Sequence, residues 1–217
     1  MPLRTWIKMC GITRADDAQA AAAAGADALG FVMTPSPRRV TPAEARKIIR
    51  TLPPHVLRLG VFVDERAAEI AEAALVAEVD RVQVHHPADP VLRDLLGARL
   101  LVAFRARDEG VPETIRESGE ETFLVDAYSP DAPGGTGRVF DWSIARHAAE
   151  HGSLILAGGL TPENVGRAIR EVRPFGVDVS TGIEDAPGIK NVGLMEAFVR
   201  AVREADAALG ADAAAAK

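Results

Sequence analysis

The sequence contains little cysteine and few aromatic residues. Among its 217 residues there are one cysteine, one tyrosine and two tryptophans. A single cysteine excludes an intrachain disulfide, and no group of residues resembles a metal cluster, so we expect no bound metal ion. The chain also lacks an apolar run long enough to span a bilayer and an N-terminal apolar stretch typical of a signal peptide. We therefore expect a cytoplasmic protein with no membrane partner.

The charge balance is mildly acidic. The formal net charge is -6 at pH 7, and the basic residues are scattered rather than clustered. This pattern argues against a nucleic-acid partner. Hydrophobic residues make up 47% of the chain, which at this length is enough for one substantial core.

Eight short apolar runs rich in Val, Ile, Leu and Phe recur along the chain. Such runs are typical of parallel strands that are buried on both faces. The predicted strands are 6–10, 28–33, 58–63, 81–85, 100–104, 122–126, 154–157 and 176–180.

Helix signals lie between these runs. Thr41, Pro42 and Glu44 place a capping residue, a proline at the first helical position and a glutamate at the third. Thr161 and Pro162 repeat the device, which predicts a second helix that begins at Pro162.

Three further helices are predicted. Residues 16–24 are nearly all alanine after two acidic residues, and Asp141 is a candidate cap for a helix that begins at Trp142. The last helix is expected at about 191–205, and the alanine-rich tail 206–217 is expected to fray because it has little to pack against.

Eight strands, each followed by a helix, predict an α/β fold: a single-domain (β/α)8 barrel over residues 1–205. A doubly wound open sheet is the alternative, although such sheets usually have five or six strands. Active sites of (β/α)8 barrels lie at the C-terminal ends of the strands, so residues at those ends are the candidates for chemistry.

Cys10 ends the first predicted strand and precedes a glycine. In a barrel its thiol would face the mouth, where a thiolate could remove a proton from carbon. The alternative is a buried cysteine that packs as a small apolar residue. Asp126 ends the sixth strand, and a carboxyl group there can act as a general acid or base. The alternative is a solvated aspartate that caps the next loop.

Glycine-rich segments follow the last two strands. Gly158 and Gly159 follow the seventh strand, and Ser180, Thr181 and Gly182 follow the eighth. Glycines allow backbone N–H groups to approach an anion closely, and these two loops form the recurrent phosphate site of the fold. The alternative is that the glycines only make tight turns.

The inner face of the barrel is expected to carry several polar groups. Lys8 shares a face with Cys10 one layer deeper, and we expect it to pair with Asp178 on the neighbouring strand. A Schiff-base lysine is the alternative. Gln83 and His85 share a face of the fourth strand and are candidates for substrate contact, although His85 could also be structural.

Two loops complete the candidate substrate site. Gly134 and Gly135 lie in a glycine-rich stretch that would approach a ligand beside the sixth strand. Arg38 follows the second strand, and an arginine there can bind a carboxylate or a phosphate by two parallel hydrogen bonds.

Ordered motifs from residue 8 to residue 198 resemble the phosphoribosylanthranilate isomerases of tryptophan biosynthesis. The resemblance is carried by KMCGIT (8–13), AGADALGF (24–31), SPR (36–38), GVFV (60–63), VQVH (82–85), GGTG (134–137), FDW (140–142), AGGL (157–160), PENV (162–165) and VDVSTGIE (177–184). One departure is His86, because the family commonly has glycine after the histidine of the fourth strand.

The resemblance implies an aldose–ketose isomerase, classed as an intramolecular oxidoreductase, that performs an Amadori rearrangement without a cofactor. The substrate would be an N-aryl aminoribose 5-phosphate. By the same resemblance, Cys10 is the general base, Asp126 is the general acid and Arg38 holds the anthranilate end. A thiolate formed near neutrality would need an electropositive mouth.

Two other functions stay open. A non-catalytic barrel that senses sugar phosphates would keep the glycine loops but would not need Cys10 and Asp126 together. A related isomerase acts on the imidazole-bearing substrate of histidine biosynthesis with an aspartate at the position of Cys10, and dual specificity is a further alternative. We expect a monomer or a homodimer.

Overall fold

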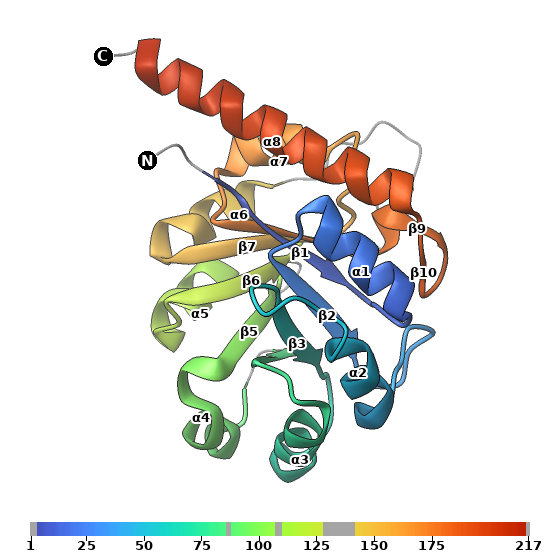
Figure 1. Ribbon diagram of the computed structural model, residues 1–217. Helices are drawn as coiled ribbons and strands as arrows, with labels where there is room; N and C mark the ends of the chain where they lie inside the picture. The colour runs from blue at the N-terminus through green and yellow to red at the C-terminus, as the bar shows by residue number, and fades with distance from the viewer. Residues whose placement is uncertain (1–3, 86–87, 107–109, 128–141, 216–217) are drawn as a thin grey trace.

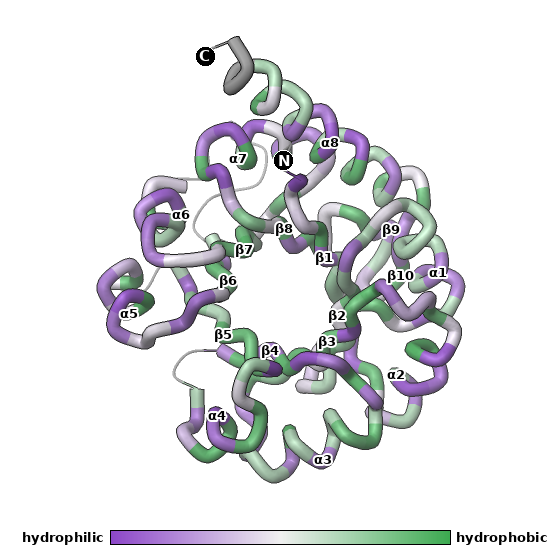
Figure 2. Tube along the Cα trace, turned by 60° about the vertical axis from the view of Figure 1, so that its left-hand side comes forward, coloured by the Kyte–Doolittle hydropathy of each residue, from purple (hydrophilic) through white to green (hydrophobic). Residues whose placement is uncertain are grey.

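The computed structural model describes residues 4–85, 88–106, 110–127 and 142–215. Eight parallel strands close into a barrel in the order β1 to β8, and helices surround it (Figure 1). Viewed along the barrel, the strands form a ring with the helices outside it (Figure 2). The predicted fold class is thus confirmed.

The strands lie close to their predicted positions. The largest difference is at the end of the third strand, which was expected at Val63 and is observed at Val61. The barrel strands are β1 (Trp6–Cys10), β2 (Ala28–Val32), β3 (Leu57–Val61), β4 (Arg81–His85), β5 (Leu100–Arg105), β6 (Thr122–Asp126), β7 (Ser153–Ala157) and β8 (Gly176–Val179).

One α-helix follows each strand in the described part of the chain. These are α1 (Ala15–Ala24), α2 (Pro42–Ile49), α3 (Ala67–Ala77), α4 (Pro90–Leu96), α5 (Val111–Ser118), α6 (Ser143–Ala148), α7 (Val165–Val172) and α8 (Val192–Ala215). Between β8 and α8 lie a short 3-10 helix (Thr181–Ile183) and an antiparallel hairpin of β9 (Glu184–Ala186) and β10 (Ile189–Lys190).

The predicted cap of α2 is confirmed, because the Glu44 N–H donates to Thr41 Oγ1 (3.2 Å) and the Thr41 N–H donates to Glu44 Oε2 (2.8 Å). The start predicted for α7 is wrong. The Thr161 N–H donates to Asn164 Oδ1 (2.9 Å), which closes a turn, and the α-helix begins only at Val165.

The last helix is longer than predicted. It runs from Val192 to Ala215, past the expected end at residue 205, because alanine favours helix even where little packs against it. Asp206, assigned above to the tail, is buried and accepts hydrogen bonds from the N–H (3.1 Å) and the hydroxyl (2.5 Å) of Thr5. The tail therefore starts after Asp206. The predicted cap Asp141 lies outside the described residues.

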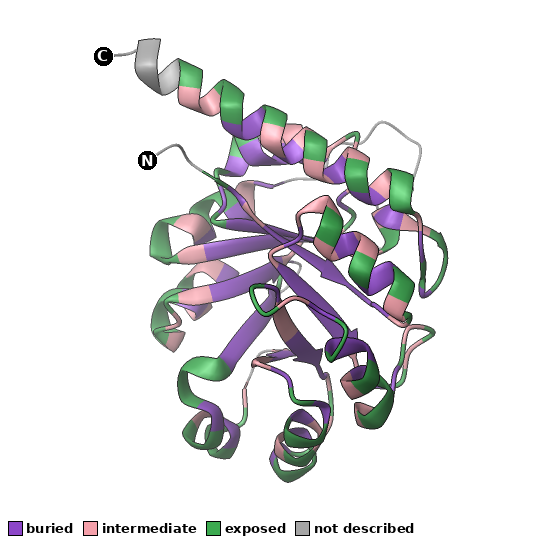
Figure 3. Ribbon diagram, in the orientation of Figure 1, coloured by how far each residue is buried: buried purple, intermediate pink, exposed green. Residues whose placement is uncertain are grey.

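The hydrophobic core has two parts. The larger part fills the space between the strands and the helices, so the strands are buried along their length while the helices bury one face (Figure 3). The smaller part fills the barrel interior, with Trp6 and Leu57 packed against it. The interior cluster is Ala28, Leu59, Leu101, Ala103, Leu124, Ile155 and Ala157.

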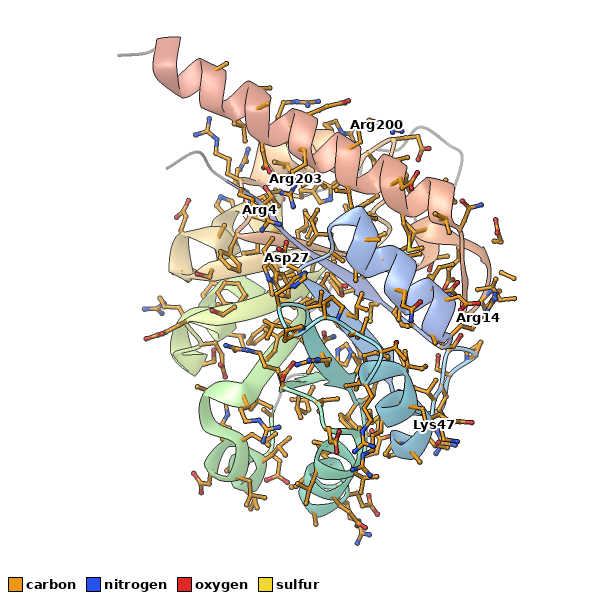
Figure 4. The ribbon with its side chains drawn as sticks, in the orientation of Figure 1. Arg4, Arg14, Asp27, Lys47, Arg200 and Arg203 are labelled. Atoms are coloured by element: carbon orange, nitrogen blue, oxygen red, sulfur yellow. The ribbon has the colours of Figure 1, made fainter. Side chains whose placement is uncertain are left out.

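Charged residues fasten the N-terminal end of the barrel. Asp27 binds Arg4 (2.7 Å) and lies 3.8 Å from Arg203 of α8, and it also accepts a hydrogen bond from the Ile7 N–H (2.9 Å) (Figure 4). This cluster joins α8 to the start of β1, at the end of the barrel opposite the C-terminal ends of the strands. None of the helices in the described part of the chain combines the length and apolar character needed to cross a bilayer.

Candidate active site

A cavity of about 320 Å³ lies at the C-terminal ends of the strands. This volume is within the range typical of small-molecule sites. Its lining residues are Cys10, Gln83, His85, Leu124, Asp126, Ala157, Gly158, Gly159, Leu160, Asp178, Ser180, Thr181 and Gly182.

Most of the predicted site residues meet in this cavity. In particular, Cys10 of β1 and Asp126 of β6 line the same space. Arg38 is not among the lining residues, and Gly134 and Gly135 lie outside the described residues, as does the departure at position 86.

Sequence reasoning missed the apolar part of the lining, which is formed by Leu124, Ala157 and Leu160. Leu124 lies two positions before Asp126, on the same inward face of β6, so strand alternation could have identified it.

Cys10 occupies space that exists because its neighbour on β2 is a glycine. The two residues are partners in the strand register. A Cβ atom at Gly30 would lie 2.7 Å from the Cys10 Sγ and 3.2 Å from the Lys8 Cε. Both distances are shorter than comfortable van der Waals contact, so a side chain at Gly30 would displace the thiol.

Burial raises the pKa of the Cys10 thiol above its ordinary value. The ammonium groups of Lys8 and Lys190 act in the opposite direction, and the carboxylate of Asp178 adds to the rise. The cations expected beside the thiol are present, but they do not bring its pKa below the ordinary value. Two cations lie close by, but the loss of hydration outweighs their attraction.

The predicted pair of Lys8 and Asp178 is confirmed. The Lys8 Nζ donates to Asp178 Oδ2 at 2.8 Å, and the lysine side chain is completely buried. Burial acts to lower the pKa of Lys8, but the charges of Asp178 and Cys10 oppose it, and the net direction is upward. The amine is therefore protonated, which disfavours the Schiff-base alternative because that role requires a free amine.

Three buried polar atoms of the cavity residues have no hydrogen-bond partner within the described part of the chain. They are Gln83 Oε1, His85 Nδ1 and Asp178 Oδ1. Burial, followed by the charge of Arg105, lowers the pKa of His85, which favours the neutral imidazole. All three atoms can then accept a hydrogen bond. Buried acceptors without partners are rare, so this set points to a ligand that carries several donors.

The two glycine-containing loops touch each other beside the cavity. Gly158 and Gly159 adopt positive φ angles of 95° and 64°. A Cβ atom at Gly182 would lie only 2.0 Å from the Leu160 carbonyl oxygen, so the loops after β7 and β8 are packed backbone to backbone. The Asn164 amide donates to the Gly159 carbonyl (2.9 Å) and fixes the first loop. This arrangement can bring backbone N–H groups to an anion.

The sequence profile of the N-(5'phosphoribosyl)anthranilate (PRA) isomerase family matches residues 7–201. The chain belongs to the phosphoribosylanthranilate isomerase family. An isomerase of this name from Pelobacter propionicus is 47% identical over 199 residues, which cover 91% of this chain and 95% of that protein.

Solved structures of phosphoribosylanthranilate isomerases share the fold. The enzyme from Thermotoga maritima has a TM-score of 0.82 and 38% identity, and the alignment covers 92% of this chain and 99% of that one. A second isomerase structure, in complex with reduced 1-(o-carboxyphenylamino)-1-deoxyribulose 5-phosphate, has a TM-score of 0.79, 36% identity and the same coverage.

Proposed function

We propose that this protein catalyses the Amadori rearrangement of N-(5-phosphoribosyl)anthranilate to 1-(2-carboxyphenylamino)-1-deoxyribulose 5-phosphate, as an aldose–ketose isomerase of tryptophan biosynthesis. The observation that carries the proposal is that Cys10 and Asp126 line one cavity whose rim holds both glycine-containing loops. Family membership supports the same activity. The reaction needs no metal ion or cofactor.

The phosphate is held by the loops after β7 and β8. Gly158, Gly159, Thr181 and Gly182 line the cavity, and Gly158 and Gly159 have positive φ angles. The phosphate does not react, so its binding energy serves to orient the sugar ring between the acid and the base. Arg38 binds the carboxylate at the other end of the substrate.

The two sugar hydroxyl groups and the amine N–H of the substrate supply the hydrogen-bond donors for Gln83 Oε1, His85 Nδ1 and Asp178 Oδ1. These are the buried acceptors that have no partner in the described protein. A ligand that satisfies them removes the free-energy cost of burying them unpaired.

Ring opening comes first. The Asp126 carboxyl group donates a proton to the furanose ring oxygen, and the bond between that oxygen and C1 breaks as the nitrogen lone pair forms the C1–N double bond. The product of this step is a cationic Schiff base. Its positive charge acidifies the hydrogen on C2.

Proton removal follows. The Cys10 thiolate takes the proton from C2, and the electron pair of the C–H bond neutralises the Schiff base to give an enolamine. Protonation at C1 and loss of the hydroxyl proton at C2 then yield the ketone. Because burial raises the pKa of Cys10, the thiolate is a minor form near neutrality but a stronger base than an ordinary thiolate. Lys8 lies beside it and stabilises the negative charge.

The test is a fluorescence assay of the anthranilate-linked sugar, generated in situ, with Cys10→Ala, Asp126→Asn and the control Asp94→Asn, an exposed aspartate on α4. We expect each site variant to lose about 10³-fold or more in turnover while it still binds the reduced product analogue, and the control to match the wild type. Turnover within tenfold of wild type in either site variant would contradict the proposed roles.

Two results would separate the alternatives. A wild-type protein that binds the analogue but never turns over substrate would be a sugar-phosphate sensor. Turnover of the imidazole-bearing substrate as well would indicate dual specificity. The cytoplasmic location and the monomeric or homodimeric state remain predictions.

A further inference from the structure

Three charged side chains beside the cavity form a connected ionic cluster. The Glu184 carboxylate accepts two parallel hydrogen bonds from Arg38, from Nε to Oε1 (2.8 Å) and from Nη2 to Oε2 (2.6 Å). The Lys190 Nζ donates to Glu184 Oε1 at 2.8 Å. The Glu184 side chain is 3% exposed and the Lys190 side chain 0%. The cluster is therefore shielded from solvent except at Arg38.

The hairpin of β9 and β10 carries Glu184 and Lys190, and it is fixed to the loop after β1 and to the first turn of α1. The Lys190 N–H donates to Asp17 Oδ2 (3.1 Å), and the Thr13 hydroxyl donates to the Gly188 carbonyl (2.5 Å). These contacts hold the carboxylate of Glu184 in a defined place. A carboxylate held in this way can orient a flexible arginine.

The cluster connects two parts of the candidate site. The Lys190 Nζ also donates to the carbonyl of Ser180, in the loop proposed to hold phosphate (3.1 Å). The Arg38 side chain crosses Gly11, the residue after Cys10. A Cβ atom at Gly11 would lie 2.6 Å from the Arg38 Cδ and 3.1 Å from the Ser180 Oγ. The arginine thus lies at the rim between the base and the phosphate loop.

The cluster has the charge and the donors to accept one more carboxylate. One carboxylate between two cations leaves a net charge of one positive unit. A guanidinium has five N–H donors, and Glu184 engages Nε and Nη2. In the described part of the chain Nη1 donates no hydrogen bond. That edge of the guanidinium is available for a second anion.

We propose that Glu184 is a positioning residue for substrate selection: it holds the Arg38 guanidinium at the rim so that the free edge meets the carboxylate of the aryl group. Lys190 joins this pair to the phosphate loop, so both ends of the substrate are held by one cluster. The inference rests on the proposed function, because it assigns the aryl carboxylate to Arg38.

Removal of the charge of Glu184 takes away the carboxylate that Arg38 and Lys190 share. In Glu184→Gln the amide cannot form the paired, charge-assisted contact with Arg38, and the arginine must be ordered by the substrate alone. Affinity for a ligand that bears the aryl carboxylate should fall about tenfold to a hundredfold. Affinity for the same ligand without that carboxylate should change little.

The experiment measures the dissociation constants of two probes by calorimetry. The first probe is reduced 1-(o-carboxyphenylamino)-1-deoxyribulose 5-phosphate, and the second is its counterpart that lacks the aryl carboxylate. The variants are Glu184→Gln, Arg38→Met and the double variant. The control is Glu78→Gln, because exposed Glu78 also bridges two arginines, Arg46 and Arg50, far from the cavity.

We expect Glu184→Gln to weaken the binding of the first probe about tenfold or more and the binding of the second probe by less than about threefold. The double variant should bind the first probe no more weakly than Arg38→Met, and the control should match the wild type. If Glu184→Gln does not fold, Glu184→Asp is used, because it keeps the charge on a side chain that is one methylene group shorter. This variant should reduce the preference for the first probe about threefold.

The inference would be overturned if Glu184→Gln weakened the binding of both probes equally. It would also be overturned if the folded variant, Glu184→Gln or Glu184→Asp, kept the wild-type preference for the first probe. These outcomes differ from failure of the proposed function, in which the wild type itself would neither turn over the anthranilate-linked sugar nor prefer the first probe.

Discussion

The two ends of the barrel interior differ in chemistry. At the C-terminal ends of the strands polar side chains share the cavity lining with Leu124 and Ala157, and Gln83 and Asp178 each keep a buried oxygen without a partner in the described structure. At the other end Trp6 and Ile155 pack against apolar neighbours. Trp6 and Ile155 lie at the same level of the barrel, because both are register partners of Gly176.

Within one sheet, the residues at the base of the barrel stabilise the fold and the residues at its mouth are available for chemistry. A buried acceptor without a partner lowers stability, so it persists where a ligand satisfies it. The apolar base and the layer beneath the helices supply the compensating stability. Substitutions at the base should therefore reduce stability alone, and substitutions at the mouth should reduce turnover.

Lys8 should show the largest effect, because it lies between the two regions. In Lys8→Met the buried carboxylate of Asp178 loses its partner, and we expect the free energy of unfolding to fall by about 3–5 kcal/mol and turnover to fall as well. Urea denaturation measures the first effect. The control Lys47→Met, at an exposed position on α2, should leave both unchanged (Figure 4).

A second substitution checks the cause. If the unpaired charge produces the loss, Asp178→Leu added to Lys8→Met should restore most of the stability but not turnover. A double variant less stable than Lys8→Met would show that the loss has a different origin.

Ile155→Ala should be next in size. The side chain is 2% exposed within the interior cluster and does not line the cavity. Its truncation should lower the free energy of unfolding by about 2–5 kcal/mol, since it leaves a void. Turnover measured well below the unfolding transition should stay within about threefold of wild type, because Ile155 does not line the cavity, although its register partner Leu124 does. A large loss of turnover in a folded variant would contradict the separation of the two ends.

Gly30→Ala should produce a smaller effect, confined to the mouth. The added methyl group would lie 2.7 Å from the Cys10 Sγ, so the thiol must move, and we expect turnover to fall about tenfold if Cys10 is the base as proposed, since a displaced base loses alignment with C2. The control is Gly210→Ala on α8, where an added Cβ meets nothing within 4 Å. That substitution should leave turnover unchanged and slightly stabilise the helix. Equal turnover in the two variants would show that turnover does not depend on the absence of a side chain at Gly30.

The sequence predicted the barrel and the pairing of Lys8 with Asp178 well, because both follow from local regularities. Apolar runs mark the strands, and alternation with a fixed strand order brings Lys8 and Asp178 to one level. The start of α7 was wrong because the Thr161 motif closes a turn before the helix. The same threonine–proline motif is compatible with a helix cap and with a turn, so the sequence alone did not distinguish them.

The cluster of Arg38, Glu184 and Lys190 could not be predicted in the same way. Arg38 and Glu184 are 146 positions apart, and the hairpin that carries Glu184 and Lys190 has strands of three and two residues, too short to show a period. The direction of the Cys10 pKa shift could not be predicted either, because the degree of burial depends on how the whole mouth closes around the thiol.

The most direct test of the account compares two pH titrations of the wild-type protein. Cys10 is the only cysteine, so the ultraviolet absorbance of the thiolate reports this residue among the thiols. As the mechanism needs the thiolate of Cys10 and the protonated carboxyl group of Asp126 together, kcat/KM should follow a bell-shaped curve, and one of its two pKa values should equal that of the thiol, above the ordinary thiol value. A kcat/KM profile in which neither limb has the pKa of the thiol would contradict the assignment of Cys10 as the base.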